Sequence, residues 1–60
     1  MVLTDFDIEV VIEILANEMG FDRNLSKYLI DQDREKYVWE KGTYYQIAQF
    51  YANIFFLGVW

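Results

Sequence analysis

One stretch decides the fold of this chain, and it consists of residues 4–21, TDFDIEVVIEILANEMGF. Thr4 and Asp7 are three residues apart, which is the spacing of the two members of a helix-capping box. Gly20 is placed to end the helix, because glycine adopts the left-handed backbone conformation at little cost. The pattern therefore predicts a helix over residues 4–19.

Apolar side chains recur at helical spacing on two sides of this helix. The principal apolar face consists of Ile8, Val11, Ile12, Leu15 and Met19. The second consists of Phe6, Val10 and Ile14. Two apolar faces on one short helix predict contacts on both of its sides. After Gly20, we expect Phe21 to fold back onto Leu15 or Ala16 in a Schellman-type stop.

The middle segment, residues 23–41, is predicted to form a second helix, with Asp22 or Asn24 as its cap. Its helical spacing is marked by Leu25, Tyr28, Leu29, Gln32 and Trp39. Gly42 is placed to end this helix, and Thr43 with Gln46 forms a second capping box that starts the next one.

A β-hairpin over residues 36–47 is the alternative for the end of this segment. Strand-forming residues flank Lys41 and Gly42, namely Tyr37, Val38, Trp39, Tyr44 and Tyr45. We favour the helical interpretation, because one short connection then both ends the second helix and starts the third.

The last segment, residues 42–60, contains no charged residue and seven of the twelve aromatic residues. On a helical wheel its polar side chains gather in one stripe, Gln46, Gln49 and Asn53. The opposite side is the expected core face, made of Ile47, Ala48, Tyr51, Ile54 and Phe55. The flanks are more apolar than solvent-exposed flanks usually are, which indicates that this helix contributes to an interface.

The length and composition favour an all-α protein, a short three-helix bundle in a single domain over residues 1–60, completed by homodimerisation through the C-terminal helix. A domain of this size buries only about 60% of the surface that its unfolded chain exposes. The chain has no cysteine and no histidine, so neither disulfides nor the common zinc sites can stabilise it. We expect the dimer interface to contain Tyr45, Phe50, Phe56, Leu57 and Trp60.

Acidity is concentrated at the N-terminal end, where the first 22 residues contain six acids and no base. Asp5, Glu9 and Glu13 recur every four residues and form one carboxylate stripe. Such a stripe suits binding to a basic surface of a partner protein, including a surface that holds nucleic acid. Direct binding to nucleic acid is not expected, because phosphate affinity requires clustered Lys and Arg. Alternatively, these acids favour the helix dipole and solubility.

The residue inventory argues against catalysis. The single serine, Ser26, has no histidine to activate it, and a chain of 60 residues has little room for a pocket of about 300 Å³. Asp31, Asp33 and Glu35 alternate like the opening of a calcium loop, but the glycine and the final glutamate of that loop are missing. We expect no enzyme activity, no metal and no cofactor. The absence of cysteine and of a basic N-terminal region fits a cytoplasmic protein.

The uncharged C-terminal segment is also long enough, narrowly, to be considered as a membrane anchor. Its amides argue against this role, since Gln46, Gln49 and Asn53 would lie in hydrocarbon. Burial in a homodimer or in a partner's groove explains the same apolar character. Membrane association is therefore the weaker alternative, together with a structural subunit anchored in a larger complex.

A short stretch resembles one known family. The loop Met19-Gly20-Phe21, followed by Ser26, Leu29 and Ile30, is similar to the first loop and second-helix start of ubiquitin-associated domains. That family is a three-helix ubiquitin-binding module, and the resemblance implies ubiquitin binding through Met19 and Phe21. It covers about a dozen residues, and the family's Gly-Asn-type second loop is not apparent. A glycine stop followed by a packed phenylalanine also explains these residues.

The sequence as a whole favours a binding protein over an enzyme. Our main hypothesis is a small regulator or inhibitor that presents the acidic helix to a partner and assembles through the C-terminal helix. Its size and acidity are typical of regulators encoded by phages and other mobile elements, and we take such an origin as part of the hypothesis.

Overall fold

The computed structural model describes residues 2–36, 39 and 44–58, and these contain four helical elements and no strand. The elements are α1 (Asp5–Glu13), the π-helix η1 (Ile14–Glu18), α2 (Arg23–Asp33) and α3 (Tyr44–Leu57). The radius of gyration is 10.3 Å, close to the roughly 10 Å expected for a compact chain of this length. The predicted all-α, three-helix class is therefore confirmed.

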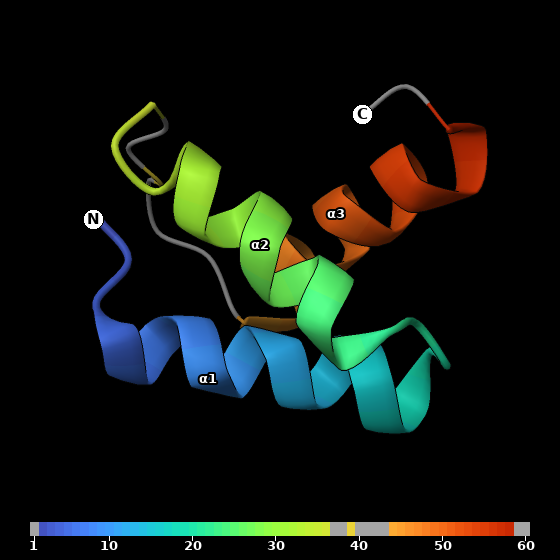
Figure 1. Cartoon of the computed structure of the whole chain (residues 1–60). Helices are drawn as coiled ribbons and strands as arrows, with labels where there is room; N and C mark the ends of the chain where they lie inside the picture. The colour runs from blue at the N-terminus through green and yellow to red at the C-terminus, as the bar shows by residue number, and fades with distance from the viewer. Residues whose placement is uncertain (1, 37–38, 40–43, 59–60) are drawn as a thin grey trace.

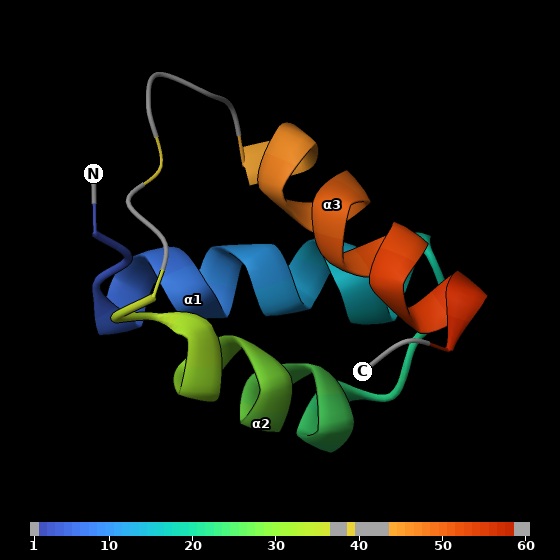
Figure 2. The same ribbon diagram turned by 90° about the horizontal axis from the view of Figure 1, so that it is seen from above.

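The first helix is the central element of the fold. α1 and η1 form one continuous rod, and both α2 and α3 contact it from the same side (Figure 1). Seen from above, α2 runs back alongside α1, and α3 crosses over the rod toward its C-terminal end (Figure 2). The other two helices thus pack against one side of the first helix.

The capping box at the start of α1 is present as predicted. The Asp7 N–H donates to the Thr4 hydroxyl at 3.2 Å, and the Thr4 N–H donates to the Asp7 carboxylate at 2.9 Å. Leu3 is buried just before the cap, as is Ile8 inside the helix. These local hydrogen bonds fix the residue at which α1 begins and the orientation of the Asp7 carboxylate.

The end of the rod differs from an ordinary α-helix. The Met19 N–H donates to the Ile14 carbonyl at 3.2 Å, a bond that spans five residues and widens the last turn into a π-helix. Gly20 then adopts a φ of +78°, as the predicted helix stop requires. The Phe21 N–H donates to the Leu15 carbonyl at 2.9 Å. This bond is one residue longer than a Schellman bond because it follows the π turn.

α2 begins as predicted but ends early. The Asp22 carboxylate accepts from the Leu25 N–H at 2.8 Å, which identifies Asp22 as the cap. The helix stops at Asp33 and continues as a turn, so its predicted extension to residue 41 is wrong. Asp31 and Asp33 lie in its last turn, which contains no basic residue, and negative charge there opposes the helix dipole.

Trp39 lies outside α2, contrary to the helical spacing assigned to it. Its ring packs edge-on against Phe50 of α3, with the ring centroids 5.1 Å apart, and tilts against Tyr51 at 6.2 Å. Tyr44 and Tyr45 belong to α3, so the second strand of the alternative hairpin is also wrong. The predicted glycine stop and capping box at residues 42 and 43 lie outside the described residues.

The core is formed mainly by the rod and by the inner side of α3. The buried apolar residues are Leu3, Ile8, Val11, Ile12, Ile14, Leu15, Ile30, Ile47, Ala48 and Tyr51. On α2 the buried positions are Ser26 and Ile30, which the predicted helical spacing did not include, whereas Tyr28, which it did include, is 61% exposed. The Ser26 hydroxyl is satisfied locally, since it donates to the Asp22 carbonyl at 2.7 Å.

The two faces of α3 follow the prediction. Ile54 and Phe55 are half-buried beside the fully buried core positions, and Gln46, Gln49 and Asn53 are exposed. The helix ends at Leu57, and the following residue, Gly58, has a φ of +68° and donates its N–H to the Ile54 carbonyl at 3.0 Å. Within the part of the chain that the structure describes, no helix has the length and apolar character needed to cross a membrane.

Candidate functional site

The second apolar face of the first helix is only partly used by the core. Ile14 is buried and Val10 is half-buried, but Phe6 is 71% exposed. Phe6 is three residues before Glu9 and seven before Glu13, so all three lie on one side of the helix. We define the α1 outer face as Asp5, Phe6, Glu9 and Glu13. It combines an exposed aromatic ring with the three carboxylates that the sequence singled out.

Two of these three carboxylates bind cations of the same chain. The guanidinium of Arg34 lies 2.6 Å from the Asp5 carboxylate, and that of Arg23 lies 2.6 Å from the Glu13 carboxylate. The pKa of Arg34 is raised, chiefly by its bond to Asp5. Glu9 makes no hydrogen bond or ion pair with the described residues. The acidic stripe is thus partly neutralised by Arg23 of α2 and by Arg34 of the turn that follows α2, which the sequence did not predict.

The ion pairs leave the carboxylates accessible. The Asp5 side chain is 93% exposed although it is paired, and the Glu13 side chain is 49% exposed. Ion pairs at such positions contribute little to stability, because water screens them. Breaking either ion pair would therefore cost the fold little stability.

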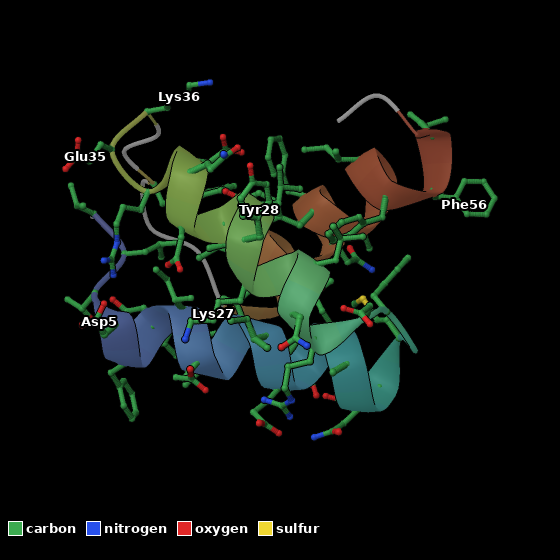
Figure 3. All side chains as sticks on the ribbon, in the orientation of Figure 1. Asp5, Lys27, Tyr28, Glu35, Lys36 and Phe56 are labelled. Atoms are coloured by element: carbon green, nitrogen blue, oxygen red, sulfur yellow. The ribbon has the colours of Figure 1, made fainter. Side chains whose placement is uncertain are left out.

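A groove lies between α1 and α2 beside Glu9. Its volume is about 410 Å³. The expectation that this small fold has little room for a pocket of about 300 Å³ was therefore wrong. The lining residues are Asp5, Ile8, Glu9, Lys27, Asp31 and Arg34. Lys27 extends from α2 toward α1 (Figure 3). Three acids and two bases thus face the groove, and no group of three His, Cys, Asp or Glu residues suited to a metal occurs among the described residues.

The remaining carboxylates of the rod bind tyrosines of α3. The Tyr44 hydroxyl donates to Asp7 at 2.7 Å, and the Tyr45 hydroxyl donates to both oxygens of Glu18 at 2.6 and 2.8 Å. These bonds raise the pKa of both tyrosines. The pKa of Asp7 is lowered by the Thr4 backbone N–H, then by Tyr44 and by the Thr4 hydroxyl. The sequence analysis treats Tyr44 and Tyr45 as strand-forming residues and Tyr45 also as an interface residue, and it misses the hydrogen bonds that their hydroxyl groups make.

The predicted interface residues of the C-terminal helix occupy three different environments. Phe56 and Leu57 are 85% and 69% exposed, and the Phe56 ring points away from the body of the molecule (Figure 3). Tyr45 is 53% exposed. Phe50 is half-buried, because it packs edge-on against Trp39 and against Tyr51. Trp60 lies outside the described residues.

The loop that resembles a ubiquitin-associated domain packs onto α3. Phe21 stacks on Phe55, with ring centroids 5.2 Å apart, and both Met19 and Phe21 are half-buried against the core. A glycine stop and a packed aromatic ring account for this geometry.

No family model, curated protein or solved structure matches this chain.

Proposed function

We propose that this protein is a non-enzymatic regulator that binds a basic surface of a partner protein through the α1 outer face. The single observation that supports this proposal best is the 71% exposure of Phe6 among the carboxylates of α1. Interfaces commonly combine a central aromatic anchor with a polar or charged rim. The mechanism is steric: the bound helix occupies a surface that the partner uses for another ligand, nucleic acid included.

Electrostatics determines which partners fit this face. The chain has a net charge of −5, and six of its ten acids precede residue 23. Their field attracts a basic surface and speeds the encounter. Among the residues that the structure describes, no cation is paired with Glu9, so Glu9 is expected to make the first ion pair with the partner. Asp5 and Glu13 then exchange Arg34 and Arg23 for the partner's cations.

We further propose that the protein assembles as a homodimer through α3. Phe56 and Leu57 supply exposed apolar surface there, and a chain of 60 residues benefits from additional burial. The alternative is a structural subunit that binds a larger complex through α3 alone. In that case α1 remains free in the assembly, and changes to its carboxylates have no effect on binding.

The experiment uses two matched charge reversals, Glu9→Lys on the proposed face and Glu35→Lys on the exposed turn after α2. Both raise the net charge by the same amount, so general electrostatic effects are equal. Tagged wild-type and variant proteins are used to capture partners from the producing cells at low and high salt, followed by mass spectrometry. The isolated proteins are also titrated with a hexalysine peptide while the backbone amides of α1 are followed by NMR.

We expect Glu9→Lys to lose both the captured partner and the peptide shifts on α1, while Glu35→Lys keeps them. Binding to the wild type is expected to weaken as salt rises, because the surface charges are screened. Equal behaviour of the two variants, or binding that does not respond to salt, contradicts the proposed function.

A further inference from the structure

α3 presents a regular row of uncharged side chains along one flank of its core face. We call this row the outer seam and define it as Tyr45, Gln49, Ala52 and Phe56. Tyr45 and Phe56 are 53% and 85% exposed, Gln49 is exposed and Ala52 is half-buried. The successive spacings of four, three and four residues are those of the a and d positions of a coiled coil. Such a row suits packing against another helix.

Charge indicates which helix that is. α3 contains no charged residue, while the rest of the chain has the whole net charge of −5. The negative charge is concentrated on the rod of α1 and η1, which contains five acids and no base, whereas α2 has two acids and two bases. Two copies of this protein therefore repel each other when they approach through the rod, and not when they approach through the uncharged outer seam. A second copy also offers an identical seam, with an aromatic ring at each end and a small residue near the middle.

From these observations we infer that two copies pair antiparallel along the outer seam and form a two-fold symmetric dimer. In this arrangement Tyr45 of one copy faces Phe56 of the other, and Gln49 faces Ala52. Each aromatic ring then packs on a ring, and the small Ala52 leaves space for the opposing amide. The geometry deepens the proposed α3 assembly and does not depend on the function proposed for α1.

The antiparallel direction follows from the position of Glu18. Its carboxylate accepts the Tyr45 hydroxyl, so it lies at the N-terminal end of the seam. A parallel pair would bring two Glu18 carboxylates to the same end. The antiparallel pair keeps the two Glu18 carboxylates at opposite ends of the seam. The seam is about 16 Å long, because it rises about 1.5 Å per residue over eleven residues. The bond to Glu18 also holds the Tyr45 ring in place before the partner arrives.

The size of the molecule is compatible with this dimer. A stable interface takes about 800 Å² from each partner, which is about a fifth of the 4213 Å² surface of the chain. Phe50 is not part of the seam, since it already packs against Trp39 and Tyr51. The α1 outer face also lies outside the seam. The dimer therefore presents two such faces and is bivalent toward a partner with repeated basic sites.

A matched pair of substitutions tests the dimer. Phe56→Glu places a charge in the seam, and Phe6→Glu makes the same change on α1. Both side chains are largely exposed, so both variants are expected to fold, which circular dichroism verifies. Dimerisation is measured by sedimentation velocity over a concentration series. We expect the wild type to dimerise and Phe6→Glu to have the same dimer dissociation constant. For Phe56→Glu we expect this dissociation constant to rise about a hundredfold or more.

A second experiment tests the register, and it is simple because the chain contains no cysteine. Equal amounts of Gln49→Cys and Ala52→Cys proteins are mixed and oxidised, and mass spectrometry identifies the disulfide products. The antiparallel pairing predicts mainly the mixed product, whereas a parallel pairing gives each variant linked to itself.

Three outcomes overturn the inference: a monomeric wild type, a dimer lost in Phe6→Glu but kept in Phe56→Glu, or predominantly self-linked cysteine products. The function proposed for α1 has a separate readout. It fails if Glu9→Lys keeps its partner, whatever the oligomeric state.

Discussion

Replacing Thr4 with alanine removes the side chain that caps the first helix and orients its acidic face. The Thr4 hydroxyl accepts from the Asp7 N–H at 3.2 Å and donates to the Asp7 carboxylate at 2.9 Å. Thr4 is exposed, so its methyl group contributes little packing. Loss of such a cap costs about 1 kcal/mol, within a range of roughly 0.5–2.

That cost is large for a chain of this size. A stability of about 0.05–0.15 kcal/mol per residue gives roughly 3–9 kcal/mol for the whole protein. A loss of about 1 kcal/mol lowers the melting temperature of so small a domain by about 4–8 °C. We therefore expect Thr4→Ala to melt several degrees below the wild type at neutral pH. Thr4→Ser keeps the hydroxyl and is expected to melt close to the wild type.

The pH dependence provides a second readout. The pKa of Asp7 is lowered by the Thr4 backbone N–H, Tyr44 and the Thr4 hydroxyl, so its stabilising effect is present above the unfolded pKa of about 3.9. That effect is lost as the pH falls through the lower folded pKa. Thr4→Ala removes one of the three donors, so an NMR titration should show the pKa of Asp7 moving up toward its ordinary value.

The assays are thermal unfolding followed by circular dichroism at neutral pH and at about pH 2, together with the Asp7 titration. The difference between wild type and Thr4→Ala is expected to shrink as the pH falls through the lowered folded pKa of Asp7. The capping argument is refuted if Thr4→Ala has the same melting temperature as the wild type, or if Thr4→Ser loses as much stability as Thr4→Ala.

Other substitutions test the packing, the helix stop and the tyrosine contacts. Leu15→Ala creates a cavity at a side chain with 0% exposure. It should lower the free energy of unfolding, measured by urea denaturation, by about 3–5 kcal/mol. A decrease under about 1 kcal/mol would contradict the placement of Leu15 in a tightly packed core. Gly20→Ala meets no atom within 4 Å, so only its positive φ is penalised, and we expect a loss of about 1–2 kcal/mol. The bond to Glu18 raises the pKa of Tyr45, so its contribution is complete below the ordinary value of 10.0 and is lost as pH rises through the folded pKa. Glu18→Gln should lower the pKa of Tyr45, measured by ultraviolet titration against Tyr45→Phe; an unchanged value would show that the bond does not form in solution.

Local features of this protein could be read from the amino acids alone. The Thr4–Asp7 box, the Asp22 cap and the Gly20 stop depend on groups within a few residues of each other. Their geometry is therefore nearly independent of the rest of the chain. The inner and outer faces of α3 were also predictable, because helical periodicity separates its three amides from its apolar residues.

The end of α2 and the position of Trp39 were decided by packing. Helical spacing extended that helix to residue 41, but the ring of Trp39 instead covers Phe50 and Tyr51 of α3. Periodicity describes one element at a time, and it cannot weigh a longer helix against burial on a different one. The choice requires the third helix to be in place.

The candidate site depends on distance in space as well. Its contacts join residues that are far apart in the sequence. The separations are 29 residues for Asp5 and Arg34, 37 for Asp7 and Tyr44, and 27 for Glu18 and Tyr45. The acidic stripe could be predicted from the sequence, but its partial neutralisation by Arg23 and Arg34 could not. Likewise, Phe6 and Ile14 appeared equivalent on one apolar face, yet Ile14 is buried and Phe6 is exposed. The difference arises because α2 and α3 cover only one side of the rod, and this leaves Phe6 in water among the carboxylates.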